Sequence, residues 1–266
     1  MSNVLQNLPD GYEVVLGVFS LRDYDTVAER WPNLAGASLD AYIEDLEAKA
    51  RSLQDRGADV EIAVIDLDEY EPWCDDAGVR PDHGDARARY ITEADPLSLT
   101  YDDSVARVLE AHVFMEQAAL AYALAADELD SDDVEIELEQ QMHDLLDDVL
   151  ANLNGVGLLS VETTNDTGDT VLGLNLMVTR DEDNDLCLVR EADGFALRAA
   201  VHCGMLNGGM VYLRTLESRR CVLRAYDLGG RQWAVGTGEQ VGAWRADRDG
   251  SVTTAGGVID IRGRAA

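Results

Sequence analysis

The period of the apolar pattern in this chain changes sharply near residues 152–157. Residues 102–129 and 134–153 carry apolar side chains at helical spacing, and the polar residues 130–133 between them supply a turn. After residue 157, β-branched runs alternate with turn signals about every ten residues, as antiparallel strands do. The pattern therefore predicts a helical hairpin followed by an all-β domain. The inward stripe of the second helix is Leu138, Met142, Leu145, Leu146, Val149 and Leu153.

Residues 1–100 show a different order of elements, namely strand, helix and strand. Apolar runs at 12–21 and 58–70 enclose residues 39–53, whose apolar side chains fall on one helical face after a serine N-cap. This order predicts a right-handed crossover between two parallel strands. Residues 71–85 are rich in Pro, Gly and Asp and are predicted to form a loop.

The expected fold class is mixed α+β, in three parts. An N-terminal α/β segment covers residues 1–100, an acidic helical hairpin that packs on it covers 101–153, and an antiparallel β-meander covers 154–266. The meander is expected to close into a barrel or to form a sandwich, because both arrangements bury one face of short strands. With 266 residues, of which 46% are apolar, the chain can bury such cores without disulfides.

The sequence also indicates where the protein is located. It contains no run of 18 apolar residues, and its start lacks a basic segment followed by an apolar one. A soluble, cytoplasmic protein without a membrane partner is expected. The cysteines form no C-x-x-C pair and are expected to be reduced thiols, namely Cys74, Cys187, Cys203 and Cys221.

The net charge of −31 is distributed unevenly. Residues 1–100 carry 22 acidic against 8 basic residues, and residues 101–153 carry 15 acidic residues against Arg107 alone. Residues 154–266 are nearly neutral, with 15 acidic against 12 basic residues. Adaptation to high salt would acidify every surface to a similar degree, so the concentration of charge in the middle of the chain indicates a local cause.

Lysine is almost absent from the sequence. Lys49 is the only one, and the other 20 basic residues are arginines, a bias typical of GC-rich genomes such as those of actinobacteria. P-loop proteins, penicillin-recognising hydrolases and pyridoxal phosphate enzymes each need a lysine in their site. Because Lys49 stands four residues after Asp45 on a predicted helix, an ion pair explains it, and the sequence argues against all three classes.

The second helix of the predicted hairpin has a row of carboxylates on its outer face. Like charges at this spacing destabilise a helix by about 0.2–0.5 kcal/mol per pair, so local stability does not explain the row. One explanation is solubility. The other is a basic partner, because carboxylates one turn apart lie roughly 6 Å from each other and resemble a polyanion. The candidate partner-binding residues are Glu135, Glu139, Asp144, Asp147 and Asp148.

The first functional hypothesis is therefore a non-enzymatic interaction protein. Its acidic hairpin would engage a basic protein surface, for instance on a nucleic-acid-binding protein that it inhibits by mimicking nucleic acid. Nucleic acid itself is not an expected partner, no cofactor is expected, and the oligomeric state stays open. Another alternative is that the hairpin only solubilises a β-domain that serves oligomerisation or ligand binding.

A different hypothesis is a metal-dependent hydrolase with its site at the end of the strand predicted at 58–70. Asp66 and Asp68 would be catalytic, and both would bind the metal together with Glu69. Ligands of open α/β sheets collect at the C-terminal ends of parallel strands, and carboxylates at alternating positions suit Mg²⁺. Against this hypothesis, the sequence shows neither a second acidic cluster of this kind nor a phosphate-binding glycine loop.

The histidines give weaker signals. His112 and His143 fall on the two hairpin helices, but His143 follows Glu139 by four residues, whereas a Glu-x-x-His metal motif needs three. Both are expected to lie at or near the surface without a metal. His202 and Cys203 are adjacent on a predicted strand, so their side chains should point to opposite faces and form no catalytic dyad.

Overall fold

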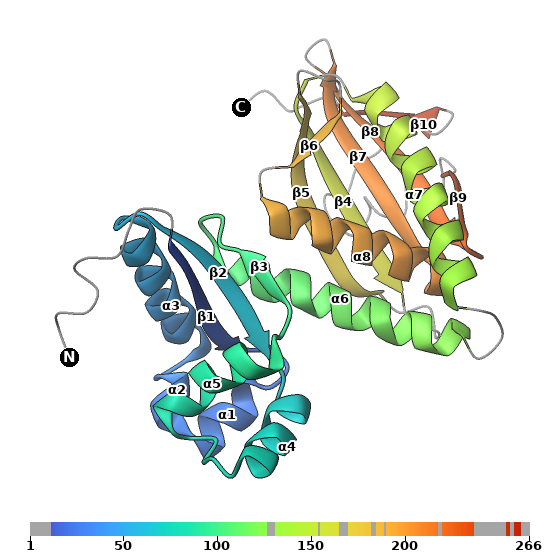
Figure 1. The fold of residues 1–266 in the computed structure, drawn as a ribbon. Coiled ribbons are helices and arrows are strands. Elements are labelled where there is room, and N and C mark those ends of the chain that lie inside the picture. Colours follow the sequence, from blue (N-terminus) through green and yellow to red (C-terminus); the bar gives the residue numbers. More distant parts are fainter. Residues whose placement is uncertain are drawn as a thin grey trace. The chain divides into compact units, whose positions relative to one another are not determined.

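The computed structural model describes residues 12–126, 131–153, 155–164, 170–181, 185–188, 190–217, 220–236, 254–255 and 258–261 (Figure 1). The chain divides into two compact units, Met1–Val113 and Phe114–Ala266. The architecture is mixed α+β, as the sequence predicts, and each unit has its own sheet. The three-part division at residues 100 and 153 stays a prediction, because the boundary between the two units lies inside a helix.

The sheet of the first unit has the order β1-β2-β3. Strands β1 (Tyr12–Phe19) and β2 (Ala58–Ile65) are parallel, with Phe19 opposite Ile65 at their C-terminal ends. This confirms the predicted parallel pair. Strand β3 (Ser98–Thr100) adds to β2 in the antiparallel sense and was not predicted, because three residues are too short for a periodic signal.

The helices of the first unit follow from local signals. The Ser38 side chain accepts a hydrogen bond of 3.2 Å from the Ala41 amide, which begins the long helix at residue 39. The helices are α1 (Tyr24–Arg30), α2 (Pro32–Ala35), α3 (Leu39–Gln54), α4 (Leu67–Ala77), α5 (Gly84–Ala94) and α6 (Val105–Ala126), which continues into the second unit.

The prediction of a loop at residues 71–85 is wrong for its first half. Helix α4 covers Leu67–Ala77 and contains Pro72, and strand β2 ends at Ile65 rather than at residue 70. Proline normally disfavours a helix interior because it removes a backbone donor. Here Tyr70 and Cys74 are fully buried on one face of α4, and this tertiary packing outweighs the local signal of the proline.

An aromatic cluster forms the core beside α4. The Tyr70 ring lies 5.8 Å from the Phe19 ring and 5.2 Å from the Tyr90 ring, measured between centroids. Trp31 and Trp73 complete the cluster at 6.5 and 6.3 Å from Tyr70. Offset and edge-on aromatic contacts of this kind stabilise a core beyond the area that they bury. The cluster therefore fixes α4 against β1 and α5.

The second unit contains a larger sheet with the order β10-β11-β8-β7-β4-β5-β6, and β9 pairs with β8. All its pairings are antiparallel, as predicted. Within the described residues the sheet is open, so the predicted closure into a barrel is wrong. The strands are β4 (Gly157–Thr164), β5 (Thr170–Arg180), β6 (Leu186–Leu188), β7 (Gly209–Glu217), β8 (Arg220–Gly229), β9 (Gln232–Val235), β10 (Thr254–Ala255) and β11 (Val258–Ile261).

A helix covers one face of this sheet where a sandwich would place a second sheet (Figure 1). Helix α8 (Glu191–Asn207) packs on β4, β5, β7 and β8, although the sequence analysis assigned its residues to strands. The segment is buried on nearly all sides, so it shows no amphipathic period. A continuous apolar run of this kind does not distinguish a buried helix from a buried strand.

Helix α7 (Ser131–Asn152) contacts α8 and β9. Leu138, Leu145 and Val149 are fully buried, and Met142 and Leu153 are buried as well, which confirms the predicted inward stripe except at Leu146, which is half-buried. The expectation that the hairpin packs on residues 1–100 stays a prediction, because the contacts given for α7 are with elements of its own unit. Among the described residues, no helix combines the length and the apolar character needed to cross a membrane.

Candidate functional site

Asp66 lies where the parallel strands of the first unit end. It follows Ile65, the last residue of β2, and occupies the N-cap position of α4 with an extended backbone. The last residue of β1, Phe19, is opposite Ile65 in the parallel pair. The C-terminal edge of a parallel sheet is where open α/β folds bind ligands, because the loops there diverge and helix N-termini point toward it.

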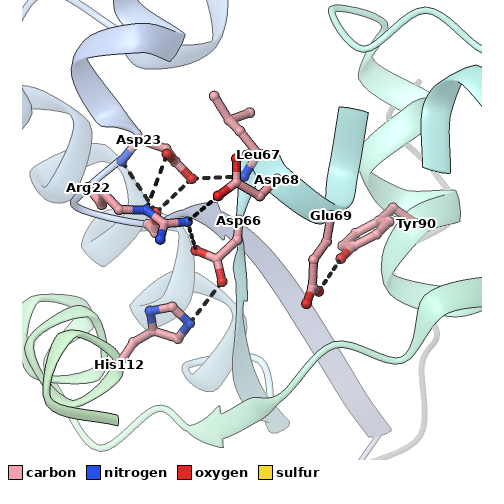
Figure 2. Close-up of polar contacts among 9 residues, drawn as sticks. Arg22, Asp23, Asp66, Leu67, Asp68, Glu69, Tyr90 and His112 are labelled. Atoms are coloured by element: carbon pink, nitrogen blue, oxygen red, sulfur yellow. Dashed lines mark hydrogen bonds and ion pairs between the residues drawn. The ribbon is translucent and has the colours of Figure 1, made fainter. Parts of the chain in front are cut away.

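The Asp66 carboxylate is turned toward helix α6 (Figure 2). Its Oδ2 atom lies 3.3 Å from Nε2 of His112, and this histidine is only 9% exposed. Its Oδ1 atom lies 3.8 Å from the Arg22 guanidinium and is buried without a hydrogen-bond partner among the described residues. A buried carboxylate oxygen without a hydrogen bond is unusual and indicates a place for a ligand, ion or water.

Asp23 explains why Asp66 is turned this way. An N-cap aspartate normally accepts a hydrogen bond from the first turn of its own helix. Here Oδ2 of Asp23 accepts a 2.8 Å hydrogen bond from the Leu67 amide, while Asp66 makes no such bond (Figure 2). Ser20 holds Asp23 in place by donating a 3.0 Å hydrogen bond to the same oxygen. Asp23 thus satisfies the helix end, and Asp66 faces His112.

Arg22 gathers the carboxylates of this cluster. Its guanidinium lies 3.3 Å from Asp68, 3.6 Å from Asp23 and 3.8 Å from Asp66. One positive charge therefore faces three negative charges, and a local excess of negative charge remains. Such an excess in a partly buried place attracts cations.

The pKa of Asp66 reflects two opposing effects. Burial by itself raises the pKa of this carboxyl, but the hydrogen bond and charge of His112, together with Ser20 and Arg22, outweigh burial and lower the pKa. Asp66 is therefore ionised at neutral pH, which is the state that a metal ligand needs.

The structure brings together only part of the site predicted from the sequence. Asp68 is paired with Arg22 and its side chain is 85% exposed. Glu69 accepts a 3.3 Å hydrogen bond from the Tyr90 hydroxyl, away from Asp66 (Figure 2). Of the three predicted ligands, Asp66 alone contacts a histidine. The sequence did not predict His112 as a neighbour of Asp66, and His112 was expected to bind no metal.

The sequence contained one pattern that could have indicated His112 as a metal ligand. Glu116 follows His112 by four residues on α6, so both side chains lie on one face of the helix. Asp66 and His112, which both lie in the first unit, belong to a group of described side chains that could hold a metal ion. No spacing rule links Asp66 to this helix, because the contact is long-range.

The acidic residues of α7 do not form one uniform surface. Glu135 forms an ion pair of 3.0 Å with Arg198 of α8, and Glu139 forms an ion pair with the same guanidinium. Asp148 is half-buried and accepts a 3.1 Å hydrogen bond from Asn152. Asp144 and Asp147 are exposed. The predicted row is thus divided between a part paired with this chain's own arginine and a part open to solvent.

Comparison with known proteins gives one match. Residues 10–102 match the family described as Domain of unknown function (DUF8829). The matched segment contains Asp66 and Arg22 and lies within the first unit. No curated protein and no solved structure matches the chain.

Proposed function

We propose that the first unit binds a divalent transition-metal ion at Asp66 and His112 and uses it in a hydrolytic reaction. The observation that carries this proposal is the buried Oδ1 of Asp66, which has no hydrogen-bond partner in the described residues. Leaving a buried carboxylate oxygen without a hydrogen bond costs free energy, and the Arg22 guanidinium at 3.8 Å is too distant to supply one. A metal ion bound at this oxygen would remove that cost. Its position at the C-terminal edge of β1 and β2 supports a functional role.

The donor atoms favour certain metals. In the alternative hypothesis drawn from the sequence, carboxylates alone would hold Mg²⁺, but the neighbour of Asp66 is an imidazole. Imidazole nitrogen suits Zn²⁺, Fe²⁺ or Mn²⁺ better than Mg²⁺, which prefers oxygen ligands. A site that combines a carboxylate with a histidine supports Zn²⁺ or Mn²⁺ as the ion.

This donor set leaves room for chemistry. Asp66 and His112 together would leave coordination positions open for water or substrate, as in catalytic rather than structural metal sites. A metal-bound water becomes a nucleophile at neutral pH because the metal lowers its pKa. Hydrolysis is therefore the reaction class that fits this donor set.

Calorimetric titration with Mn²⁺ and Zn²⁺ tests the metal site. The wild-type protein is expected to show saturable binding, and Asp66→Asn is expected to weaken it by at least about tenfold, because the variant removes a ligand charge. Asp68→Asn is the matched control: it removes an equal charge from an exposed neighbour and should change affinity by no more than about twofold. Equal losses in both variants would show diffuse attraction and contradict the site. Hydrolysis of p-nitrophenyl acetate and phosphate by the metal-loaded protein then tests the reaction.

A second candidate function concerns the exposed acids of α7. We propose that Asp144 and Asp147 contribute to a surface for a basic protein partner, of the kind that mimicry of nucleic acid would require. Both side chains are exposed. Asp144 also stands four residues before Asp148, and like charges at this spacing are unfavourable for the helix itself, which supports a role outside the helix.

Pull-down from lysate of the source organism tests this second candidate. The double variant Asp144→Asn, Asp147→Asn should lose at least about half of the captured basic protein at low salt, because the field steering the partner is weaker. The control is Asp75→Asn, Asp76→Asn, which removes two exposed acids from α4. The captured protein is then purified and titrated against both variants. Equal affinity for the two would exclude the α7 surface as the contact.

A further inference from the structure

The second unit contains a cavity that is independent of the proposed metal site. It has a volume of about 190 Å³ and is lined by residues of α6, α7 and α8. Its apolar wall includes Met115, Ala118 and Phe195. The polar residues that line it are Tyr122, Glu135, Arg198 and His202. A small cavity with an apolar wall and a few converging polar groups is the usual form of a small-molecule site.

The charges around this cavity do not balance. Arg198 contacts both Glu135 and Glu139, so one guanidinium serves two carboxylates. His202 could supply a second positive charge to Glu139, since its Nε2 lies 3.6 Å from the Glu139 carboxylate. Burial, however, lowers the pKa of His202, and the imidazole is neutral at physiological pH. Within the part of the chain that the structure describes, Glu135 and Glu139 therefore carry one negative charge more than Arg198 balances.

His202 provides a second, independent sign of a ligand. The residue is only 2% exposed, and its Nδ1 lies 2.5 Å from the Tyr122 hydroxyl. Its Nε2 atom is buried and has no hydrogen-bond partner among the described residues, because the Glu139 oxygen lies beyond hydrogen-bond distance. A buried ring nitrogen of this kind in a cavity wall marks a position where a ligand atom completes the hydrogen bonding.

We propose that this cavity binds a small organic amine. Its ammonium group would meet Glu135, Glu139 and Nε2 of His202, and would supply the missing positive charge. Its apolar part would lie against Met115 and Phe195. The rings of Tyr122 and Phe195 add a favourable contact, because an ammonium group is attracted to the face of an aromatic ring.

The charge balance favours an amine over the other two ligand classes of this size. A carboxylate would have to displace Glu135 or Glu139 from Arg198 and would add a second uncompensated negative charge. A neutral alcohol would fill the apolar part but would leave the existing negative charge unmatched. The amine alone satisfies both the charge and the hydrogen bonding of the cavity.

Calorimetric titration of the full chain with three probes of equal size tests this proposal: phenethylamine, 2-phenylethanol and phenylacetate. Phenethylamine is expected to bind at least about tenfold more tightly than the alcohol, with the acid weakest, because of the unbalanced charge. Glu135→Gln should weaken amine binding by about fivefold or more. Glu137→Gln is the matched control on the same helix, since Glu137 lies 3.8 Å from Arg231 and does not line the cavity.

Three results would overturn the proposal. Tightest binding of phenylacetate would show that Arg198 is the recognition group. Equal affinity for all three probes, or equal losses of amine affinity in Glu135→Gln and Glu137→Gln, would show that the cavity does not discriminate between ligands by charge. Absence of binding by any probe at millimolar concentration would show that the cavity is not a site for ligands of this size.

Discussion

Replacing Gly209 by alanine is expected to lower the free energy of unfolding of the second unit by about 2–3 kcal/mol or more, since overpacking a tight site forces the backbone to move. A Cβ atom at Gly209 would lie 2.5 Å from the carbonyl oxygen of Glu162, 3.2 Å from Cα of Gly204 and 3.3 Å from Cα of Thr163. All three are backbone atoms of β4 and α8 and cannot rotate away. The loss is measured by urea unfolding followed by circular dichroism.

Gly173→Ala in β5 is the matched control. Gly173 is also a strand glycine, but a Cβ there would meet no heavy atom of the described residues within 4 Å. Alanine should be neutral or stabilise by roughly 0.5–1 kcal/mol, because glycine loses more conformational freedom on folding. If Gly209→Ala and Gly173→Ala had the same stability, the close approach of β7 to β4 and α8 would be disproved.

Replacing Tyr70 by alanine is expected to destabilise the first unit by about 3–5 kcal/mol, the range for large aromatic residues removed from a core. The ring is fully buried and lies within 6.5 Å of Phe19, Trp31, Trp73 and Tyr90, so its removal leaves a cavity at the centre of the aromatic cluster. Urea unfolding provides the measurement.

Tyr70→Phe separates the ring from the hydroxyl. The hydroxyl donates a 2.9 Å hydrogen bond to the Pro81 carbonyl, and its loss should cost only about 1 kcal/mol. A phenylalanine variant as unstable as the alanine variant would assign the effect to the hydrogen bond and contradict the role of the cluster. The phenylalanine ring should keep α4 packed in place. Because Asp66 is the N-cap of this helix, the phenylalanine variant should also keep the metal affinity of the wild-type protein.

The elements that the sequence predicted correctly are those with a clear period. The caps and apolar spacing of α3, between two apolar strands, identified the parallel crossover of β1 and β2. The spacing of Leu138, Leu145 and Val149 identified the buried face of α7. In each case one side of the element faces solvent and the other faces the core. Apolar residues therefore recur at a regular spacing in the sequence.

The elements that the sequence predicted wrongly lack this asymmetry or depend on distant residues. Helix α8 is buried on most sides, so its seventeen residues gave no helical period and Arg198 was not expected beside α7. For the same reason His202 and Cys203 were placed on a strand. Helix α4 contains Pro72, whose local effect is outweighed by the packing of Tyr70.

The candidate sites show the same limit. Asp66 was found because it directly follows an apolar strand, but its partner His112 lies 46 positions away and is brought to it only by the fold. Likewise, the sequence predicted the row of carboxylates on α7. It did not predict that Arg198 of α8 pairs with two of them, because this pairing depends on a contact between two helices. No spacing rule in the sequence predicts contacts between side chains that lie this far apart along the chain.

The exchange of tasks between Asp23 and Asp66 has a consequence for how this region tolerates change. A helix N-terminus and a cation both favour a negatively charged oxygen, and a carboxylate that turns toward the amides of its own helix turns away from His112. Because Asp23 already bonds the Leu67 amide, a chain that lost Asp23 would draw the neighbouring carboxylate back to the helix. Positions 23 and 66 therefore form a coupled pair, in which Asp23 caps the helix and Asp66 remains turned toward His112.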